Sequence, residues 1–93
     1  MANHKSALKR IRSSAQRRMR NRVQKSRTRT LYKKATHAIE EGDDLQAAIE
    51  QTRRAVSQLD KSVSKGVIHK NQAARKKSRL MKRLAELEAQ MTS

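Results

Sequence analysis

The sequence of 93 residues contains no cysteine, no proline, no phenylalanine and no tryptophan. Without cysteine it forms neither disulfides nor thiolate metal sites, which fits a reducing compartment. Without proline, and with few runs of β-branched residues, helices can continue uninterrupted. The single aromatic residue, Tyr32, gives no platform on which several bases could stack. A nucleic acid would therefore be recognised through its phosphates, sugars and shape.

Acidic residues are absent from the first 34 positions, where thirteen lysines and arginines occur. The whole chain carries 24 Lys and Arg against 8 Asp and Glu, a net charge of +16. Charges this dense repel one another, so the sequence predicts an anionic partner, and a nucleic-acid backbone is the densest in a cell. Only 34% of the residues are hydrophobic, which predicts a thin core and a protein that completes its folding on its partner.

Signals for membranes, metals and catalysis are also lacking. No apolar run approaches the ~20 residues of a membrane span, and no apolar stretch of a secretory signal follows the basic start. The three histidines lie far apart, and neither a Walker loop nor a dinucleotide fingerprint occurs. The acidic residues of 40–44 fall at a predicted helix end and cap, where acid is common. The sequence predicts a non-enzymatic protein without cofactor, metal or membrane attachment.

Two glycines, Gly42 and Gly66, divide the chain into three predicted helices at roughly 5–41, 44–64 and 69–91. Asp43 with Gln46 forms a capping-box pattern before the second helix, and Lys65 suits the end of that helix. Apolar residues repeat every three or four positions in the second and third segments. They are Leu45, Ala48, Ile49, Thr52, Val56, Leu59 and Val63, and then Ala73, Leu80, Leu84, Leu87 and Met91. This pattern predicts an all-α, three-helix up-down-up bundle.

The first segment carries two apolar stripes that point to roughly opposite sides of a helix. They are Leu31, Ala35, Ala38 and Ile39 near its end, and Leu8, Ile11, Ala15, Met19 and Val23 near its start. Its 37 residues would extend about 55 Å, against about 32 Å for the second segment. We therefore expect one domain, 1–93, with an extended basic N-terminal helix whose first part, about 1–22, overhangs as an arm. The early stripe would face RNA, a partner protein, or nothing until assembly.

Three stretches are more specific than composition: 1–10 (MANHKSALKR), 65–80 (KGVIHKNQAARKKSRL), and 20–30 with its Arg-Asn-Arg, Lys-Ser and Arg-Thr pairs. They resemble the bacterial small-subunit ribosomal protein S-twenty family. Length and helix count agree over the whole chain, whereas 43–64 and 86–93 match in pattern alone. The resemblance implies a three-helix bundle that binds small-subunit (16S) ribosomal RNA directly and early in subunit assembly. The expected contacts are the five-prime domain and the long helix near the three-prime end of that RNA.

By position, the resemblance places RNA contacts in two groups. The first is Lys5, Lys9, Arg10, Arg12, Arg17, Arg18, Arg20, Asn21, Arg22, Lys25, Arg27, Arg29, Lys33 and Lys34; the second is His69, Lys70, Asn71, Arg75, Lys76 and Arg79. On spacing alone, His69 to Asn71 would be an ordinary helix N-terminus, and the resemblance favours RNA contact there. We expect Tyr32 to lie in the core rather than to stack on a base.

The predicted function is that of a structural protein of the small ribosomal subunit, monomeric within it and located in the cytoplasm. A cation-bearing helix between RNA backbones would screen their repulsion and set their spacing. The alternative is a histone-like structural DNA-binding protein, which charge alone would support. A basic membrane binder is disfavoured because Trp and Phe are absent and the cations surround the helix. A disordered basic tail is disfavoured by the helical spacing of its apolar residues.

Overall fold

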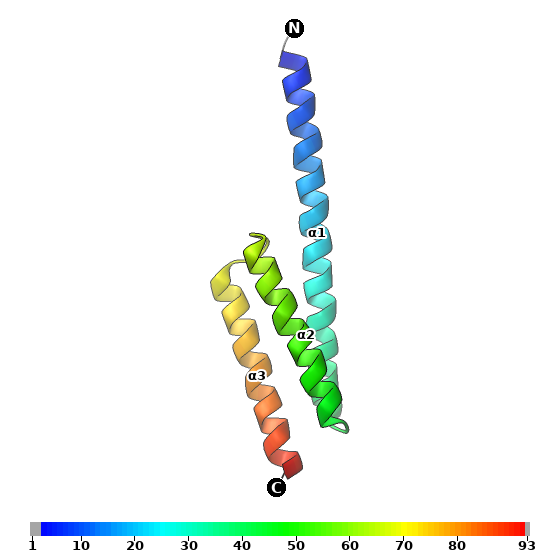
Figure 1. Ribbon diagram of the computed structural model, residues 1–93, viewed down its shortest axis with the longest axis vertical. Coiled ribbons are helices and arrows are strands. Elements are labelled where there is room, and N and C mark those ends of the chain that lie inside the picture. The colour runs from blue at the N-terminus through cyan, green and yellow to red at the C-terminus, as the bar shows by residue number, and fades with distance from the viewer. Residues whose placement is uncertain (1–2, 93) are drawn as a thin grey trace.

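The computed structural model describes residues 3–92, with side chains from residue 6, and shows three α-helices in an elongated bundle (Figure 1). Helix α1 spans Asn3–Glu41, α2 spans Leu45–Ser64 and α3 spans Lys70–Thr92. Neighbouring helices run in opposite directions, and residues 3–92 contain no strand. The predicted all-α up-down-up bundle with an extended first helix is therefore confirmed. The extents of 73 × 21 × 13 Å describe a rod, because α1 is nearly twice as long as α2.

The turn between α1 and α2 is built on Gly42 and Asp44. Gly42 has φ +62°, a conformation that other residues adopt at a cost, and its N–H donates to the carbonyl of Ala38. Asp44 is extended at φ −138°, and its carboxylate accepts the Ala47 N–H at 3.2 Å. The predicted capping box of Asp43 and Gln46 is therefore wrong by one position. Because the glycine turn ends only after residue 43, the next residue is the one that caps α2.

The connection between α2 and α3 is a Schellman motif around Gly66. The N–H of Gly66, at φ +72°, donates to Val63, and the N–H of Val67 donates to Ser62. His69 then caps α3: its carbonyl accepts the Ala73 N–H, and its Nδ1 accepts the Asn71 N–H at 3.1 Å. This sharp turn brings the start of α3 beside α1 and α2.

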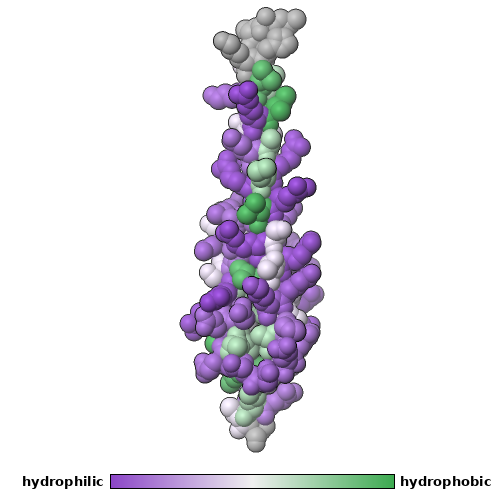
Figure 2. All heavy atoms as spheres, turned by 90° about the vertical axis from the view of Figure 1, so that its right-hand side faces the viewer, coloured by the Kyte–Doolittle hydropathy of each residue, from purple (hydrophilic) through white to green (hydrophobic). Residues whose placement is uncertain are grey.

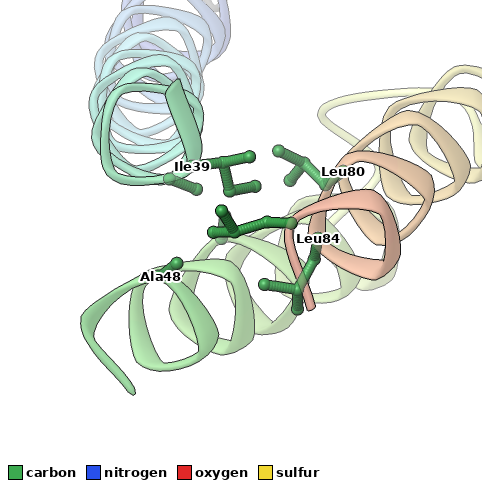
Figure 3. Close-up of a cluster of buried hydrophobic side chains, with 7 residues drawn as sticks. Ile39, Ala48, Leu80 and Leu84 are labelled. Atoms are coloured by element: carbon green, nitrogen blue, oxygen red, sulfur yellow. The ribbon is translucent and has the colours of Figure 1, made fainter. Parts of the chain in front are cut away.

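The core is a thin layer where the three helices meet. Figure 3 shows Ile39 from α1, Ala48 from α2, and Leu80 and Leu84 from α3 pointing toward one another. Tyr32 is partly buried and packs against this cluster, which confirms its predicted position. Small residues such as Ala35 and Ala48, both fully buried, allow the helices to approach closely.

Two features of the core differ from the sequence prediction. Thr28, Gln58 and Ser62 are buried, although apolar periodicity did not include them. Met91, placed in the apolar stripe of α3, is 46% exposed. Figure 1 shows the reason, because the last turn of α3 extends past the α1–α2 turn, where neither helix covers it.

Candidate nucleic-acid interface

The N-terminal half of α1 projects beyond the other two helices (Figure 1). Among the described residues, the first side-chain hydrogen bond from α1 to another helix is at Gln24, and the first buried residue of α1 is Thr28. The residues of α1 before this point are helical, but neither α2 nor α3 packs over them. We call residues 3–22, the described part of the predicted overhang, the arm.

The arm leaves the bundle at a cluster of hydrogen-bonded polar side chains, which we call the polar junction: Gln24 and Thr28 of α1 with Gln58 and Ser62 of α2. The hydroxyls of Thr28 and Ser62 lie 2.7 Å apart, and Gln58 Nε2 donates to Gln24 Oε1 at 2.8 Å. The Thr28 hydroxyl also lies 2.8 Å from the Gln24 carbonyl. Polar partners at defined positions fix how α1 lies along α2, and hence where the arm begins.

The predicted basic residues of α1 with described side chains are exposed to solvent. From Lys9 to Lys34 every one of them, and Asn21 with them, is exposed. Among the residues with described side chains, none of these cations forms an ion pair, because the three observed pairs involve other basic groups. Figure 2 shows hydrophilic side chains on both sides of the rod along α1. The side chain of Lys5 lies outside the described part of the chain.

A line of apolar side chains runs down the arm between these cations (Figure 2). Leu8, Ile11, Met19 and Val23 are 53%, 64%, 70% and 47% exposed. The line faces away from α2 and α3, as the two opposed stripes of the sequence predicted. The arm therefore has an uncovered apolar strip flanked by positive charge.

The second predicted group lies at the start of α3. His69, Lys70, Asn71, Arg75 and Arg79 are exposed. Lys76 is half-buried because its ammonium lies over the ring of Tyr32, 5.4 Å from the centroid. His69 both caps α3 and reaches solvent, so the helix-terminus and ligand-contact interpretations are compatible.

The fold brings part of the two groups together. Lys25, Arg29 and Lys33 of α1 line one groove with His69 and Lys76 of α3. The groove also contains Val67, Ile68 and Gln72, which the sequence prediction did not include because uncharged residues gave no charge signal. The glycine turn before Val67 was the available indication that this segment would fold back onto α1. The arm cations do not line this groove, but Arg18 and Arg22 line a neighbouring hollow together with Lys25 and Arg29, so the two surfaces adjoin.

The opposite end of the bundle is acidic. The α1–α2 turn carries Glu40, Glu41, Asp43 and Asp44, and a Cβ on Gly42 would lie 3.2 Å from Leu87 of α3. Glu86 and Glu88 therefore lie near the same end. Negative charge repels phosphates, so this end of the bundle is the part of the described surface least suited to a nucleic acid.

Comparison with known proteins identifies the family to which this geometry belongs. The sequence model of the family described as Ribosomal protein S20 matches residues 2–85, which is most of the chain. The chain belongs to the ribosomal protein S20 family. This confirms the resemblance seen in the sequence. It also extends it across α2, where the sequence stretches had matched in pattern alone.

Relatives in the S20 family resemble the chain over nearly its full length. The small ribosomal subunit protein bS20 of Thermotoga neapolitana is 49% identical over 86 residues, covering 92% of this chain and 87% of the relative. Those of Thermomicrobium roseum and Roseiflexus sp. (strain RS-1) are 52% and 51% identical, over 94% and 96% of this chain and 87% and 96% of the relatives.

The S20 family is a ribosomal protein family and not a family of enzymes. Over residues 3–92, no helix combines the length and apolar character needed to cross a bilayer. Within the same residues, no three His, Cys, Asp or Glu side chains gather where a metal ion would need them. The feature that stands out on the described surface is its unpaired positive charge.

Proposed function

We propose that this chain is a structural protein of the small ribosomal subunit that binds ribosomal RNA through the basic residues of α1, in and beyond the arm, and through the start of α3. The observation that carries the proposal is a projecting helix with exposed, unpaired cations, in a chain of the S20 family. The unit of function is the single domain 1–93, acting as a monomer within the subunit in the cytoplasm.

The proposed contact residues are the two groups named from the sequence, from Lys5 to Lys34 and from His69 to Arg79. Apart from the half-buried Lys76, those with described side chains are exposed, and none of them takes part in an observed ion pair, which supports this assignment. The proposed partner regions are the five-prime domain of the RNA and the long helix near its three-prime end. An arm with cations around its circumference suits a position between several backbones.

The mechanism is electrostatic and geometric. Phosphate-rich helices repel one another as ribosomal RNA folds, and the arm places cations between them at fixed intervals along a helix. The bundle holds the base of the arm, so that binding of α3 and the arm to different RNA segments fixes their relative position. Phosphate contacts carry little sequence information, so selectivity comes from the shape of folded RNA.

Replacement of Arg17, Arg18, Arg20 and Arg22 by Ala tests the arm. We expect weaker binding to small-subunit ribosomal RNA, and a salt slope of log K smaller by about 3, since each lost phosphate contact removes roughly 0.7–0.9. Filter binding at several KCl concentrations measures both quantities. Circular dichroism should show the bundle helices retained.

The matched control replaces Arg53, Arg54, Lys82 and Arg83, which removes the same charge from exposed positions outside the proposed contacts. It should keep most of the affinity. If the arm variant bound as tightly as the unchanged protein, the arm would not be a main RNA contact.

A histone-like DNA-binding role is the second candidate, because unpaired cations attract any nucleic acid. Competition between ribosomal RNA and duplex DNA at near-physiological salt separates the two. We expect the RNA to displace the DNA, because its folded shape presents backbones on several sides of the arm. Equal affinity for both would favour the DNA-binding role.

A further inference from the structure

The groove between α1 and the start of α3 differs from the arm in having walls and a floor. We call it the α1–α3 groove, and define it by Lys25, Arg29 and Tyr32 on α1 with Ile68, Gln72 and Lys76 opposite. It encloses about 890 Å³ and is open to solvent along its length. A ligand there would touch two helices at once, whereas a ligand on the arm touches one.

Charge in the α1–α3 groove is arranged in a line. Lys25, Arg29 and Lys33 are four residues apart, so they lie on one face of α1 at intervals of about 6 Å along the axis. Lys76 adds a fourth cation from α3. The one carboxylate that lines the groove, Glu40, lies at the end nearest the α1–α2 turn. The occupant that fits is a linear anion that runs along α1 and stops before Glu40.

Tyr32 in the floor of the groove is not presented for base stacking. It is packed against the core, and the ammonium of Lys76 lies over its ring, so this ring offers no free face. Val67 and Ile68 are half-buried and supply apolar surface instead. Apolar floor with cationic walls suits a ribose–phosphate backbone, with sugars inward and phosphates toward the cations.

His69 adds a directed donor. Its Nδ1 accepts the Asn71 N–H at 3.1 Å, so in the neutral ring the proton is on Nε2. Nε2 can then donate to a phosphate oxygen or a 2′-hydroxyl. Gln72, exposed and on the same wall, can both donate and accept.

We propose that the α1–α3 groove binds the sugar–phosphate backbone of a single RNA strand, running from Lys25 past Lys33 and ending before Glu40. The proposal rests on the RNA-binding function proposed above and specifies how the contacts of Lys25, Arg29 and Lys33 with those of His69 and Lys76 are made, together with the uncharged residues Val67, Ile68 and Gln72. The arm lies between backbones, while the groove holds one strand against the bundle and fixes its direction.

The substitution Gln72→Trp tests this site without changing charge. An indole at this exposed wall position would fill the groove, and we expect affinity for folded small-subunit ribosomal RNA to fall about tenfold, or ~1.4 kcal/mol. The control Gln46→Trp, at an exposed position near the acidic end, should bind like the unchanged protein. Circular dichroism of both variants should match that of the unchanged protein.

A second pair of variants tests the wall cations. Lys25→Gln with Arg29→Gln should lower the salt slope by about 1.4–1.8, the value for two phosphates. Lys82→Gln with Arg83→Gln removes the same charge from exposed positions away from the groove and should change the slope little. Resonances of the Val67 and Ile68 methyl groups should shift on RNA addition in the unchanged protein and not in Gln72→Trp.

The outcomes separate the two proposals. If the unchanged protein failed to bind the RNA, the proposed function would be wrong. If it bound, and Gln72→Trp bound equally or more tightly, the groove assignment alone would be overturned. The same holds if the Val67 and Ile68 signals stayed in place while the arm variant lost affinity.

Discussion

Among the buried residues, Thr52 has the poorest match between its chemistry and its surroundings. It lies on the core face of α2 with 2% of its surface exposed, and its hydroxyl has no hydrogen-bond partner among the residues that the structure describes. A buried hydroxyl without a partner loses its hydration and gains nothing in return. The Ser62 hydroxyl, which lies in the same helix and is paired with that of Thr28, shows the alternative.

Replacement of Thr52 by Val should therefore stabilise the protein. Valine has nearly the same shape and removes the desolvation penalty, so we expect the free energy of unfolding to rise by about 1–2 kcal/mol. Urea denaturation measures this directly. A loss of stability would show that the hydroxyl is hydrogen-bonded in solution.

At the scale of helices, the polar junction decides how α1 and α2 fit together where the arm begins. Thr28 is the only buried residue of α1 before Ala35 in the described part of the chain. Ser62, fully buried, meets it in the last turn of α2. The hydrogen bond between these two hydroxyls joins the base of the arm to the last turn of α2.

A double-mutant cycle on Thr28→Val and Ser62→Ala tests that pairing. Thr28→Val alone leaves the Ser62 hydroxyl buried with only a 3.5 Å contact from Gln58, which should cost about 1–3 kcal/mol. With Ser62→Ala added, no hydroxyl is left unpaired. We expect the double variant to be about 1 kcal/mol more stable than the sum of the single effects predicts. Strictly additive values from urea denaturation would argue against a coupled pair.

The helices and most of the core could be predicted from sequence because glycines and apolar spacing are local signals. Gly42 and Gly66 gave each boundary to within two residues of the structure. The polar junction could not be predicted, since Thr28 and Ser62 contribute nothing to an apolar stripe and are buried only because their partner is opposite. The exposure of Met91 likewise depends on where α1 and α2 end.

For the candidate interface, the charge pattern of the sequence predicted the arm but not the α1–α3 groove. A run of like charges without acid is visible in the sequence, and its exposure follows from the excess length of α1. The α1–α3 groove depends on Gln72, Val67 and Ile68 meeting α1 across the bundle. Contacts between uncharged residues so far apart in the sequence depend on the tertiary structure, and no local sequence signal indicates them.

For the molecule as a whole, folding and RNA binding should respond to salt in opposite directions. A net charge of +16 on a rod only 21 Å across at its second axis creates strong internal repulsion. Raising KCl from 10 mM to 1 M shortens the Debye length from about 30 to 3 Å and screens that repulsion. The same screening weakens attraction to phosphates.

We therefore expect the melting temperature of the free protein to rise with KCl, by about 4–8 °C for each 1 kcal/mol of repulsion removed. The variant lacking Arg17, Arg18, Arg20 and Arg22 should show a smaller rise. Thermal melts followed by circular dichroism give both values. A melting temperature that stayed constant or fell with salt would mean that repulsion does not limit stability.

The order of the helices along the chain has a consequence for biosynthesis. Because α1 comes first in the chain, its cations are translated before any residue of α2 or α3. At 5–20 residues per second, the roughly 50 residues that follow α1 take about 3–10 s to be made. During those seconds a nascent polycation emerges beside the translating ribosome, whose own RNA is the nearest polyanion. A newly made copy is therefore expected to meet ribosomal RNA before its three-helix bundle is complete.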